Sequence, residues 1–232
     1  MLKFGNSEKD IRRIIAEYGK DSVDWELISE KAVLSEAFID EFKRDVYWNK
    51  ISVFQKLSED FIDSHIKFLY WSDIARHQKL SESFIERHRD DFDWHDLCRC
   101  QKLSEPFMEK YFNRIFLAPV CSNQKLSETF LNKHWSRFDN FCWDAICYHQ
   151  ELSEAFMEKF ADKLNWAFVC QKQKLSEEFC IKYARFIDIS LLETNEKSIV
   201  DLTKIWVEKS RLLSEKNAVM RPVWYMAQQN IR

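Results

Sequence analysis

Residues 78–101 have the sequence QKLSESFIERHRDDFDWHDLCRCQ, which is one repeat unit and the glutamine that begins the next, and this pattern recurs along most of the 232 residues. Its Leu-Ser-Glu tripeptide occurs seven times, and neighbouring copies are 23 residues apart except for the fifth interval, which is 26 residues. The copies begin at Leu34, Leu57, Leu80, Leu103, Leu126, Leu152 and Leu175. A similarity that returns at one fixed period is typical of repeat proteins, in which each repeat packs on its neighbours.

Each repeat predicts two short helices. In the unit quoted above, Ser81 stands where an N-cap hydroxyl would accept a backbone N–H, and Glu82 follows in the first turn, where the helix dipole favours negative charge. Leu80 and Ile85 have the spacing of a hydrophobic staple. A second helix then begins near a tryptophan, which recurs as Trp25, Trp48, Trp71, Trp94, Trp143 and Trp166, with Leu117 in the remaining repeat.

The second helix carries a buried stripe three, four and seven residues after this tryptophan, the spacing of one helical face. The fourth position is small, and Ser, Ala or Cys occupies it. The seventh is a glutamine in six repeats, and we expect its amide to bond backbone groups of the adjoining turn, because buried polar groups need partners. In the better-formed repeats an Asp or Asn precedes the helix as a predicted N-cap, namely Asp24, Asp93, Asn165 and Asp188.

Two helices of two or three turns cannot bury their apolar faces alone, so the repeats must stack. We therefore predict an all-α fold, an α-solenoid of stacked two-helix 23-residue repeats with helical terminal caps. The predicted parts are an N-terminal cap and degenerate first repeat at 1–33, seven two-helix repeats at 34–190 and C-terminal capping helices at 191–232. In the last part, Ser198 to Leu213 predicts one long amphipathic helix, and residues 222–226 are expected to seal the array.

The composition agrees with this fold and excludes several others. The chain has 19 Phe, 9 Trp and 7 Tyr but only two Gly and three Pro, too few for hairpin-rich β folds or glycine-rich phosphate loops. With 35 basic and 38 acidic residues the net charge is −3, which argues against a global polyanion-binding surface. No apolar run approaches the ~20 residues of a membrane span. Together with the lack of a signal-peptide core, this predicts a soluble, cytoplasmic protein whose seven cysteines are reduced.

The phrase Gln-Lys-Leu-Ser-Glu-x-Phe, followed some fourteen residues later by Asp-Trp-x-x-Ile, resembles a short helical repeat of hypothetical proteins from bacteriophages and large DNA viruses. The resemblance covers roughly residues 20 to 190. It implies a viral or prophage origin and a helical array, and it transfers no catalytic residue. Because such small viral proteins often bind and disable host factors, it also implies a protein that acts on a host protein or ribonucleoprotein complex.

The sequence predicts no catalytic residue, cofactor or metal site. Cys98, Cys121, Cys147 and Cys170 share the small position of the second helix, and Cys98, Cys100 and His95 do not have the spacing of a common zinc site. Histidines at 65, 88 and 134 occupy a position that holds Phe or Tyr in other repeats, so we expect partly buried, hydrogen-bonded rings. We therefore expect no enzyme.

Binding residues are predicted where the repeat is variable or broken. The irregular segment, residues 113–149, has Pro119 in its second helix and an inserted Asn-Phe-Cys at 140–142, although drift in a tolerant loop would explain these changes equally well. The candidate protein-binding residues are Arg76, His77, Arg99, Asn123, Trp135, Phe141, Tyr148 and His149. The expected function is a non-enzymatic, protein-binding solenoid that sterically blocks a host defence complex such as a CRISPR effector.

A nucleic-acid-binding solenoid is the main alternative. A lysine usually follows the repeat glutamine, and Lys56, Lys79, Lys102, Lys125 and Lys174 would form a basic stripe suited to a phosphate backbone. A glutamate lies three residues after each of these lysines, so stripes of opposite sign on a solvated face are a simpler explanation. A third alternative is an enzyme in the irregular segment that depends on Cys142 or His134.

Overall fold

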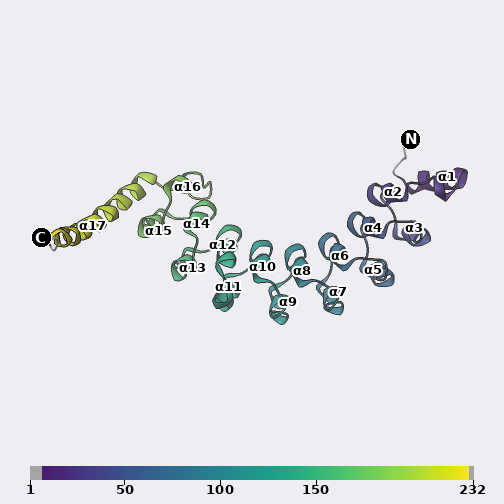
Figure 1. Ribbon diagram of the computed structural model, residues 1–232, viewed down its shortest axis with the longest axis horizontal. Coiled ribbons are helices and arrows are strands. Elements are labelled where there is room, and N and C mark those ends of the chain that lie inside the picture. Colours follow the sequence, from purple (N-terminus) through teal and green to yellow (C-terminus); the bar gives the residue numbers. More distant parts are fainter. Residues whose placement is uncertain (1–6, 230–232) are drawn as a thin grey trace. The chain divides into compact units, whose positions relative to one another are not determined.

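The computed structural model describes the backbone of residues 7–229 and the side chains of residues 7–215. All regular structure in this part of the chain is helical, and the second helices of successive repeats pack on one another, as α2 does on α4, α4 on α6 and α6 on α8 (Figure 1). The predicted all-α solenoid is therefore confirmed.

In chain order the helices are α1 (Glu8–Tyr18), η1 (Lys20–Ser22), α2 (Trp25–Lys31), α3 (Glu36–Glu41), α4 (Trp48–Phe54), α5 (Glu59–His65), α6 (Trp71–His77), α7 (Glu82–Arg87), α8 (Trp94–Cys100), α9 (Glu105–Lys110), α10 (Leu117–Asn123), α11 (Glu128–His134), η2 (Trp135–Arg137), α12 (Asn140–His149), α13 (Glu154–Lys159), α14 (Trp166–Lys172), α15 (Glu177–Lys182), α16 (Ile189–Glu193) and α17 (Leu202–Gln229). From α1 to α16, odd-numbered helices are the first helices of their repeats and even-numbered ones the second.

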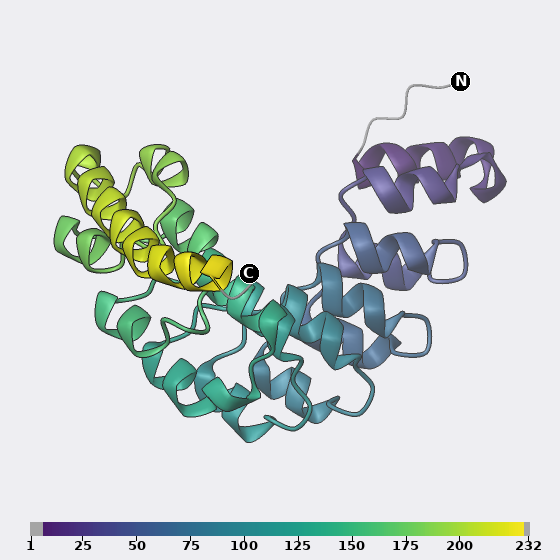
Figure 2. The same cartoon turned by 60° about the vertical axis from the view of Figure 1, so that its left-hand side comes forward.

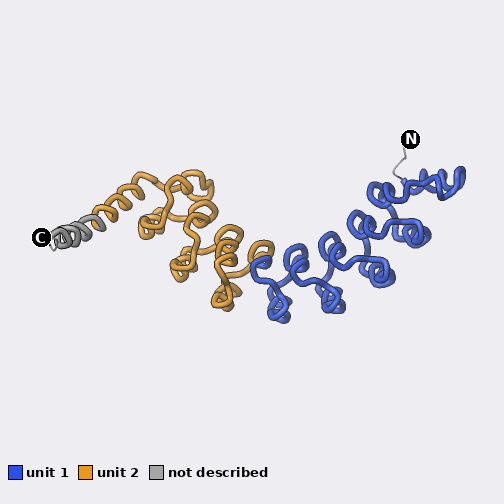
Figure 3. The backbone as a smooth tube through the Cα atoms, in the orientation of Figure 1, with its two compact units in different colours: residues 1–120 blue, residues 121–232 orange. Residues whose placement is uncertain are grey.

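The chain divides into two compact units, unit 1 at residues 1–120 and unit 2 at residues 121–232 (Figure 3). Within each unit, the second helices lie side by side in one row and the first helices form another (Figure 1 and Figure 2).

The helix starts follow from the capping residues. Ser81 Oγ accepts the N–H of Phe84 at 3.1 Å, and the serines of all six remaining Leu-Ser-Glu copies cap their helices in the same way. The four predicted caps of second helices also accept backbone N–H groups, for example Asp24 from Leu27 at 3.0 Å. These side chains satisfy donors that a helix start would otherwise leave without a partner.

The core lies between the two rows and contains the Phe of the first helices from α3 to α15 and the residue that follows it, which is Ile, Leu, Met or Cys. Phe84 and Ile85 are fully buried, as are Phe38 and Ile39 two repeats earlier. The tryptophan of the second helix is packed at the edge of this core. In four repeats its indole N–H donates to the carbonyl five residues before it, at 2.9 Å for Trp94 and Arg89. The aromatic ladder is therefore mostly structural, and in these four repeats the indole N–H is satisfied within the repeat.

The buried glutamines join each repeat to the one before it. Gln78 Nε2 donates to the carbonyls of Ser52 and Gln55, both at 2.8 Å, and its Oε1 accepts the N–H of Leu57 at 3.1 Å. Gln55, Gln150 and Gln173 make the same three bonds in their own repeats. The predicted backbone partners are confirmed, and the two carbonyls belong to the preceding repeat, so this side chain holds the array together.

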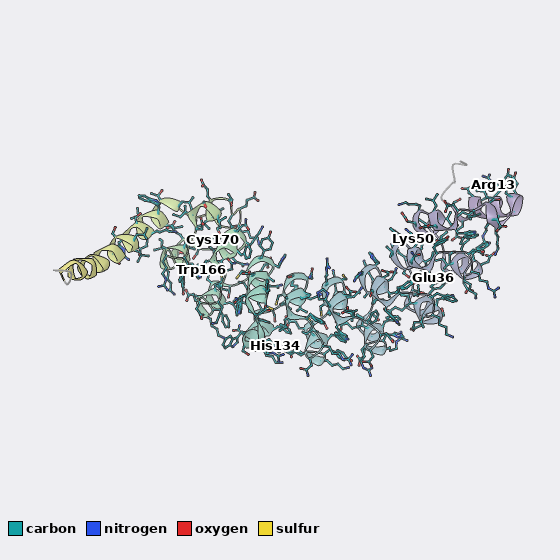
Figure 4. The ribbon with its side chains drawn as sticks, viewed as in Figure 1. Arg13, Glu36, Lys50, His134, Trp166 and Cys170 are labelled. Carbon is teal, nitrogen blue, oxygen red and sulfur yellow. The ribbon has the colours of Figure 1, made fainter. Side chains whose placement is uncertain are left out.

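Glutamates of the first helices make a second connection between repeats. Glu59 accepts hydrogen bonds from the backbone N–H and the hydroxyl of Ser81 in the next repeat, the latter at 2.9 Å. Glu36 on α3, which is labelled in Figure 4, does the same for Ser58. The sequence predicted only a favourable position beside the helix dipole, whereas this carboxylate also binds the next cap.

The side chain at the small position of the second helix also accepts a backbone hydrogen bond. Ser29 Oγ accepts the N–H of Tyr47 at 3.1 Å, and Cys98 Sγ accepts that of Phe116 at 3.4 Å. Cys170 on α14 (Figure 4) accepts the N–H of Asp188 at 3.3 Å. Serine and cysteine therefore suit this position because they are small and can also bond the backbone of the next repeat.

The long C-terminal helix begins later than the sequence predicts, at Leu202 and not at Ser198. Ser198 Oγ accepts the N–H of Leu175 at 2.9 Å, and Asn195 Nδ2 donates to the carbonyls of Cys170 and Gln173 at 2.8 and 2.7 Å. Together these two side chains make the bonds that a glutamine makes in other repeats, which keeps Ser198 out of the helix. Helix α17 then packs on α15 and α16. The predicted seal at residues 222–226 lies outside the described side chains.

Candidate protein-binding surface

Six of the seven cysteines are buried in the packed repeats, and Cys100 is exposed. Burial raises the pKa of Cys98 to about 11 and that of Cys147 to about 12. A hydrogen bond with the Cys142 thiol, together with burial, raises the pKa of Cys121 as well. Nucleophilic attack and metal binding require thiolates. These three buried cysteines are therefore neutral thiols near pH 7.

The histidines at 65, 88 and 134, which share one repeat position, contact neighbouring groups. His65 lies 3.0 Å from Asp40 Oδ1 through Nε2 and 3.0 Å from the Phe61 carbonyl through Nδ1, and its hydrogen bond lowers the pKa of Asp40. His88 Nε2 lies 2.6 Å from Asp63. His134 is buried at the end of α11 (Figure 4). Among the residues that the structure describes, no three or more His, Cys, Asp or Glu side chains form a group that could hold a metal ion.

The insertion at 140–142 lengthens a second helix and exposes a phenylalanine. Helix α12 has ten residues where α4, α6, α8 and α14 have seven, and Asp139 caps it by accepting the N–H of Cys142 at 2.8 Å. Cys142 faces the core, whereas Phe141 is 76% exposed. Seven residues make almost two helical turns, so Phe141 and Tyr148 lie on the same side of α12, about 10 Å apart along its axis.

Tyr148 is held in place by the neighbouring helix α14. Its ring meets the edge of Phe168 with centroids 5.3 Å apart and planes at 83°, and the Lys172 ammonium lies 4.5 Å from the Tyr148 centroid. The ring nevertheless remains 39% exposed. A ring that is packed on one side and open on the other loses little rotamer freedom when it binds a partner.

A hollow of about 1060 Å³ lies at the C-terminal end of α12, where the turns of three successive repeats in unit 2 meet. Its lining contains Asn123 and His149 from the predicted protein-binding set and Lys125 and Lys174 from the predicted lysine stripe. Lys197 also lines it. We call Asn123, Phe141, Tyr148 and His149 the α12 surface.

The other predicted protein-binding residues lie elsewhere. Arg76, His77 and Arg99 belong to unit 1, and Arg76 Nε donates to the buried carboxylate of Asp96 at 3.0 Å. Trp135 lies in η2, where its half-exposed ring packs on Phe160 with centroids 5.8 Å apart. The predicted set is therefore not one patch within either unit.

The five stripe lysines are all exposed, and none is paired with a carboxylate in the part of the chain that the structure describes. The glutamates three residues after them begin first helices, and they are Glu59, Glu82, Glu105, Glu128 and Glu177. Of these, Glu59, Glu82 and Glu128 accept bonds from serines of the next repeat. The lysines are thus free to meet an anion.

Three further exposed rings in unit 1, those of Tyr47, Phe68 and Tyr70, are not among the residues that the sequence predicts for binding. Composition alone does not distinguish them from the many buried aromatic residues of this chain. One signal is present in the sequence, since Tyr47 and Tyr70 occupy the position of the Asp or Asn caps.

Comparisons with protein-family models, with curated proteins and with solved structures find no match to this chain. The resemblance to viral repeat proteins stays a prediction. No helix in the described residues is both long and apolar enough to cross a bilayer.

Proposed function

We propose that this protein is a binding module that recognises a protein partner through the α12 surface and performs no chemistry on it. The observation that carries the proposal is Phe141. It is a highly exposed aromatic side chain, introduced by an insertion that the other repeats lack, and it lies in line with the half-exposed Tyr148. Exposed aromatic residues of this kind anchor protein interfaces when they enter pockets of a partner.

The remaining polar groups support recognition over catalysis. The buried thiols, the repeat glutamines and the rings of His65 and His88 are engaged by neighbouring groups within the array. The groups around the hollow, Asn123 and His149 together with three lysines, can form the polar rim that surrounds interface anchors.

The proposed mode of action is steric, because an array of packed repeats presents a wide surface that covers part of its partner. The narrower proposal, inhibition of a host defence complex such as a CRISPR effector, depends on the resemblance to phage and viral repeats.

A pull-down with matched variants tests the α12 surface. The tagged full chain, the double variant Phe141→Ala/Tyr148→Ala and the control Phe54→Ala, which removes an exposed phenylalanine of α4 in unit 1, are compared with host lysate. We expect a protein that binds wild type and control but is lost from the double variant, and the identified partner is then tested with purified components. Circular dichroism verifies that all three fold. Recovery of no protein partner, or equal recovery with the double variant, would contradict the proposal.

The lysine stripe supports a second candidate, nucleic-acid binding in unit 2. Lys125, Lys174 and Lys197 line one hollow together with two glutamates, of which Glu128 is already engaged by Ser153, so cations outnumber acidic groups there. Charge reversal of Lys125 and Lys174 should weaken RNA or DNA binding, and the affinity should fall steeply with salt. Binding that is insensitive to both would exclude this candidate.

A further inference from the structure

Two neighbouring second helices of unit 1 begin without the side-chain cap that most others have. Asp24 and Asp93 accept backbone N–H groups at the starts of α2 and α8, whereas Tyr47 and Tyr70 precede α4 and α6 and make no capping bond. The absence of a good cap costs about 0.5–2 kcal/mol per helix. A position where two adjacent repeats depart from a local stability rule is a place to look for function.

The residues in place of these caps put flat rings on the surface. Tyr47 is 46% exposed and Tyr70 61% exposed. Phe68, two residues before Tyr70, stacks on Trp48 with centroids 4.9 Å apart and planes at 14°, yet remains 46% exposed. All four rings line a hollow of about 590 Å³ that spans two repeats. The Trp48 indole N–H already donates to Lys43, so this hollow presents mainly the faces of rings.

The charge of this hollow is positive. Arg44 and Lys67 line it, and neither makes an ion pair or a side-chain hydrogen bond with any residue that the structure describes. Asp45 is the acidic residue of the lining, and it is neutralised by Lys20, whose Nζ lies 2.7 Å from its carboxylate. A ligand that complements this hollow is therefore an anion with flat, apolar rings.

We propose that this hollow, the tyrosine hollow of unit 1, binds single-stranded nucleic acid. Bases stack on the exposed rings of Tyr47, Phe68 and Tyr70, while Arg44 and Lys67 meet the phosphates between them. Single-strand binders combine these two elements, and stacking on aromatic side chains tolerates any base sequence. Tyr47 and Tyr70 are equivalent in consecutive repeats, so the array offers stacking partners at a regular interval, as an extended strand requires.

The tyrosine hollow is independent of the α12 surface and of the lysine stripe. It belongs to the turns that lead from first to second helices, whereas the lysines lie in the turns that lead from second helices to the next repeat. It also differs in chemistry, because stacking requires unpaired bases. A duplex keeps its bases in the stack and should bind more weakly than a single strand.

The test measures fluorescence anisotropy of a labelled oligo-dT of about 15 nucleotides with the full chain at low salt. The decisive variant is Tyr47→Asn/Tyr70→Asn, because asparagine supplies the missing cap without adding charge and so preserves folding. We expect its affinity to be at least about tenfold weaker, since each stacked base contributes about 1–3 kcal/mol. For Arg44→Ala/Lys67→Ala we expect a weaker salt dependence, in which the negative slope of log affinity against log salt becomes shallower by about 1.4.

Two controls separate this site from the rest of the surface. Phe54→Ala removes an exposed ring outside the hollow, and Lys56→Ala/Lys79→Ala removes two stripe lysines, so both should leave the affinity within about twofold of wild type. The proposal is overturned if the wild-type chain does not bind the oligonucleotide, if the asparagine pair binds it as well as wild type does, or if a duplex of the same length binds equally well. If wild type binds no oligonucleotide and the asparagine pair fails to bind a protein partner that wild type binds, the hollow is a protein-binding site and not a nucleic-acid site.

Discussion

The second helices α6 and α8 occupy equivalent places in consecutive repeats but begin differently. Asp93 caps α8 by accepting the N–H of His95 at 2.8 Å, whereas Tyr70 precedes α6, makes no capping bond and exposes its ring. The connections between repeats are nevertheless the same, since Gln78 and Gln101 both donate to two carbonyls of the preceding repeat. This difference indicates that groups buried between repeats cannot change without losing their partners, whereas residues in the exposed turns can change and can serve in binding.

The largest effect should come from the connection that both repeats share. Gln78→Leu leaves the carbonyls of Ser52 and Gln55 and the N–H of Leu57 without their partner. Each unsatisfied buried group costs about 1–3 kcal/mol, so we expect the free energy of unfolding to fall by at least about 3 kcal/mol in guanidinium titrations. Gln171→Leu, at a half-buried position of α14, is the control and should change it by less than about 0.5 kcal/mol. Equal losses would show that the glutamine bonds contribute little.

The cap of α8 should have the next largest effect. Asp93→Ala removes the acceptor for His95 and should lower the free energy of unfolding by about 1 kcal/mol. Tyr70→Ala has no capping bond to lose, so the same measurement should give a clearly smaller change. Equal losses of stability in the two variants would contradict the difference in capping energy that the geometry of the two helix starts indicates.

The reverse exchange should stabilise the protein. Tyr70→Asn places a cap former before α6 and should raise the free energy of unfolding by about 0.5–1 kcal/mol, measured by the same titration. Together with the weaker oligonucleotide binding expected of the asparagine pair, this gain would show that stability was given up for function. A loss of stability would mean instead that the Tyr70 ring supports the fold.

The smallest effect is expected from the lysine stripe. Lys79→Ala removes an exposed side chain that has no carboxylate partner among the described residues, so the free energy of unfolding should stay within about 0.5 kcal/mol of wild type. Thermal unfolding monitored by circular dichroism at low and high salt checks this. A larger loss, especially one that salt removes, would reveal a structural ion pair.

Much of the fold was predictable because its signals are local. The serine and aspartate caps, the buried Phe ladder and the need of each repeat glutamine for backbone partners all follow from spacing within one repeat. The bond from Glu59 to Ser81 could not be predicted, because it joins residues 22 positions apart that meet only when repeats stack. The start of α17 was predicted wrongly for the same reason, since the partners of Ser198 lie in the repeat before it.

The candidate site was less predictable than the fold. Variable positions in the repeat indicated Asn123, Tyr148 and His149, and the insertion indicated Phe141, but spacing alone could not show that these residues lie near one end or one side of α12. The same reasoning grouped Arg76 with them, although it lies in unit 1 and binds Asp96. Exposure of an aromatic ring depends on what covers it, and only the stacked repeats reveal this.

The sequence by itself determined that this chain is a helical array, which residues cap its helices and which rings face its core. Each of these depends on intervals of a few residues that a single helix or turn enforces. Tertiary structure alone decided how the repeats are joined, which rings remain open and which cations remain unpaired. Those properties depend on groups about 20 to 29 positions apart in the sequence, such as Lys20 and Asp45, which neutralise each other and leave Arg44 and Lys67 free beside the exposed tyrosines.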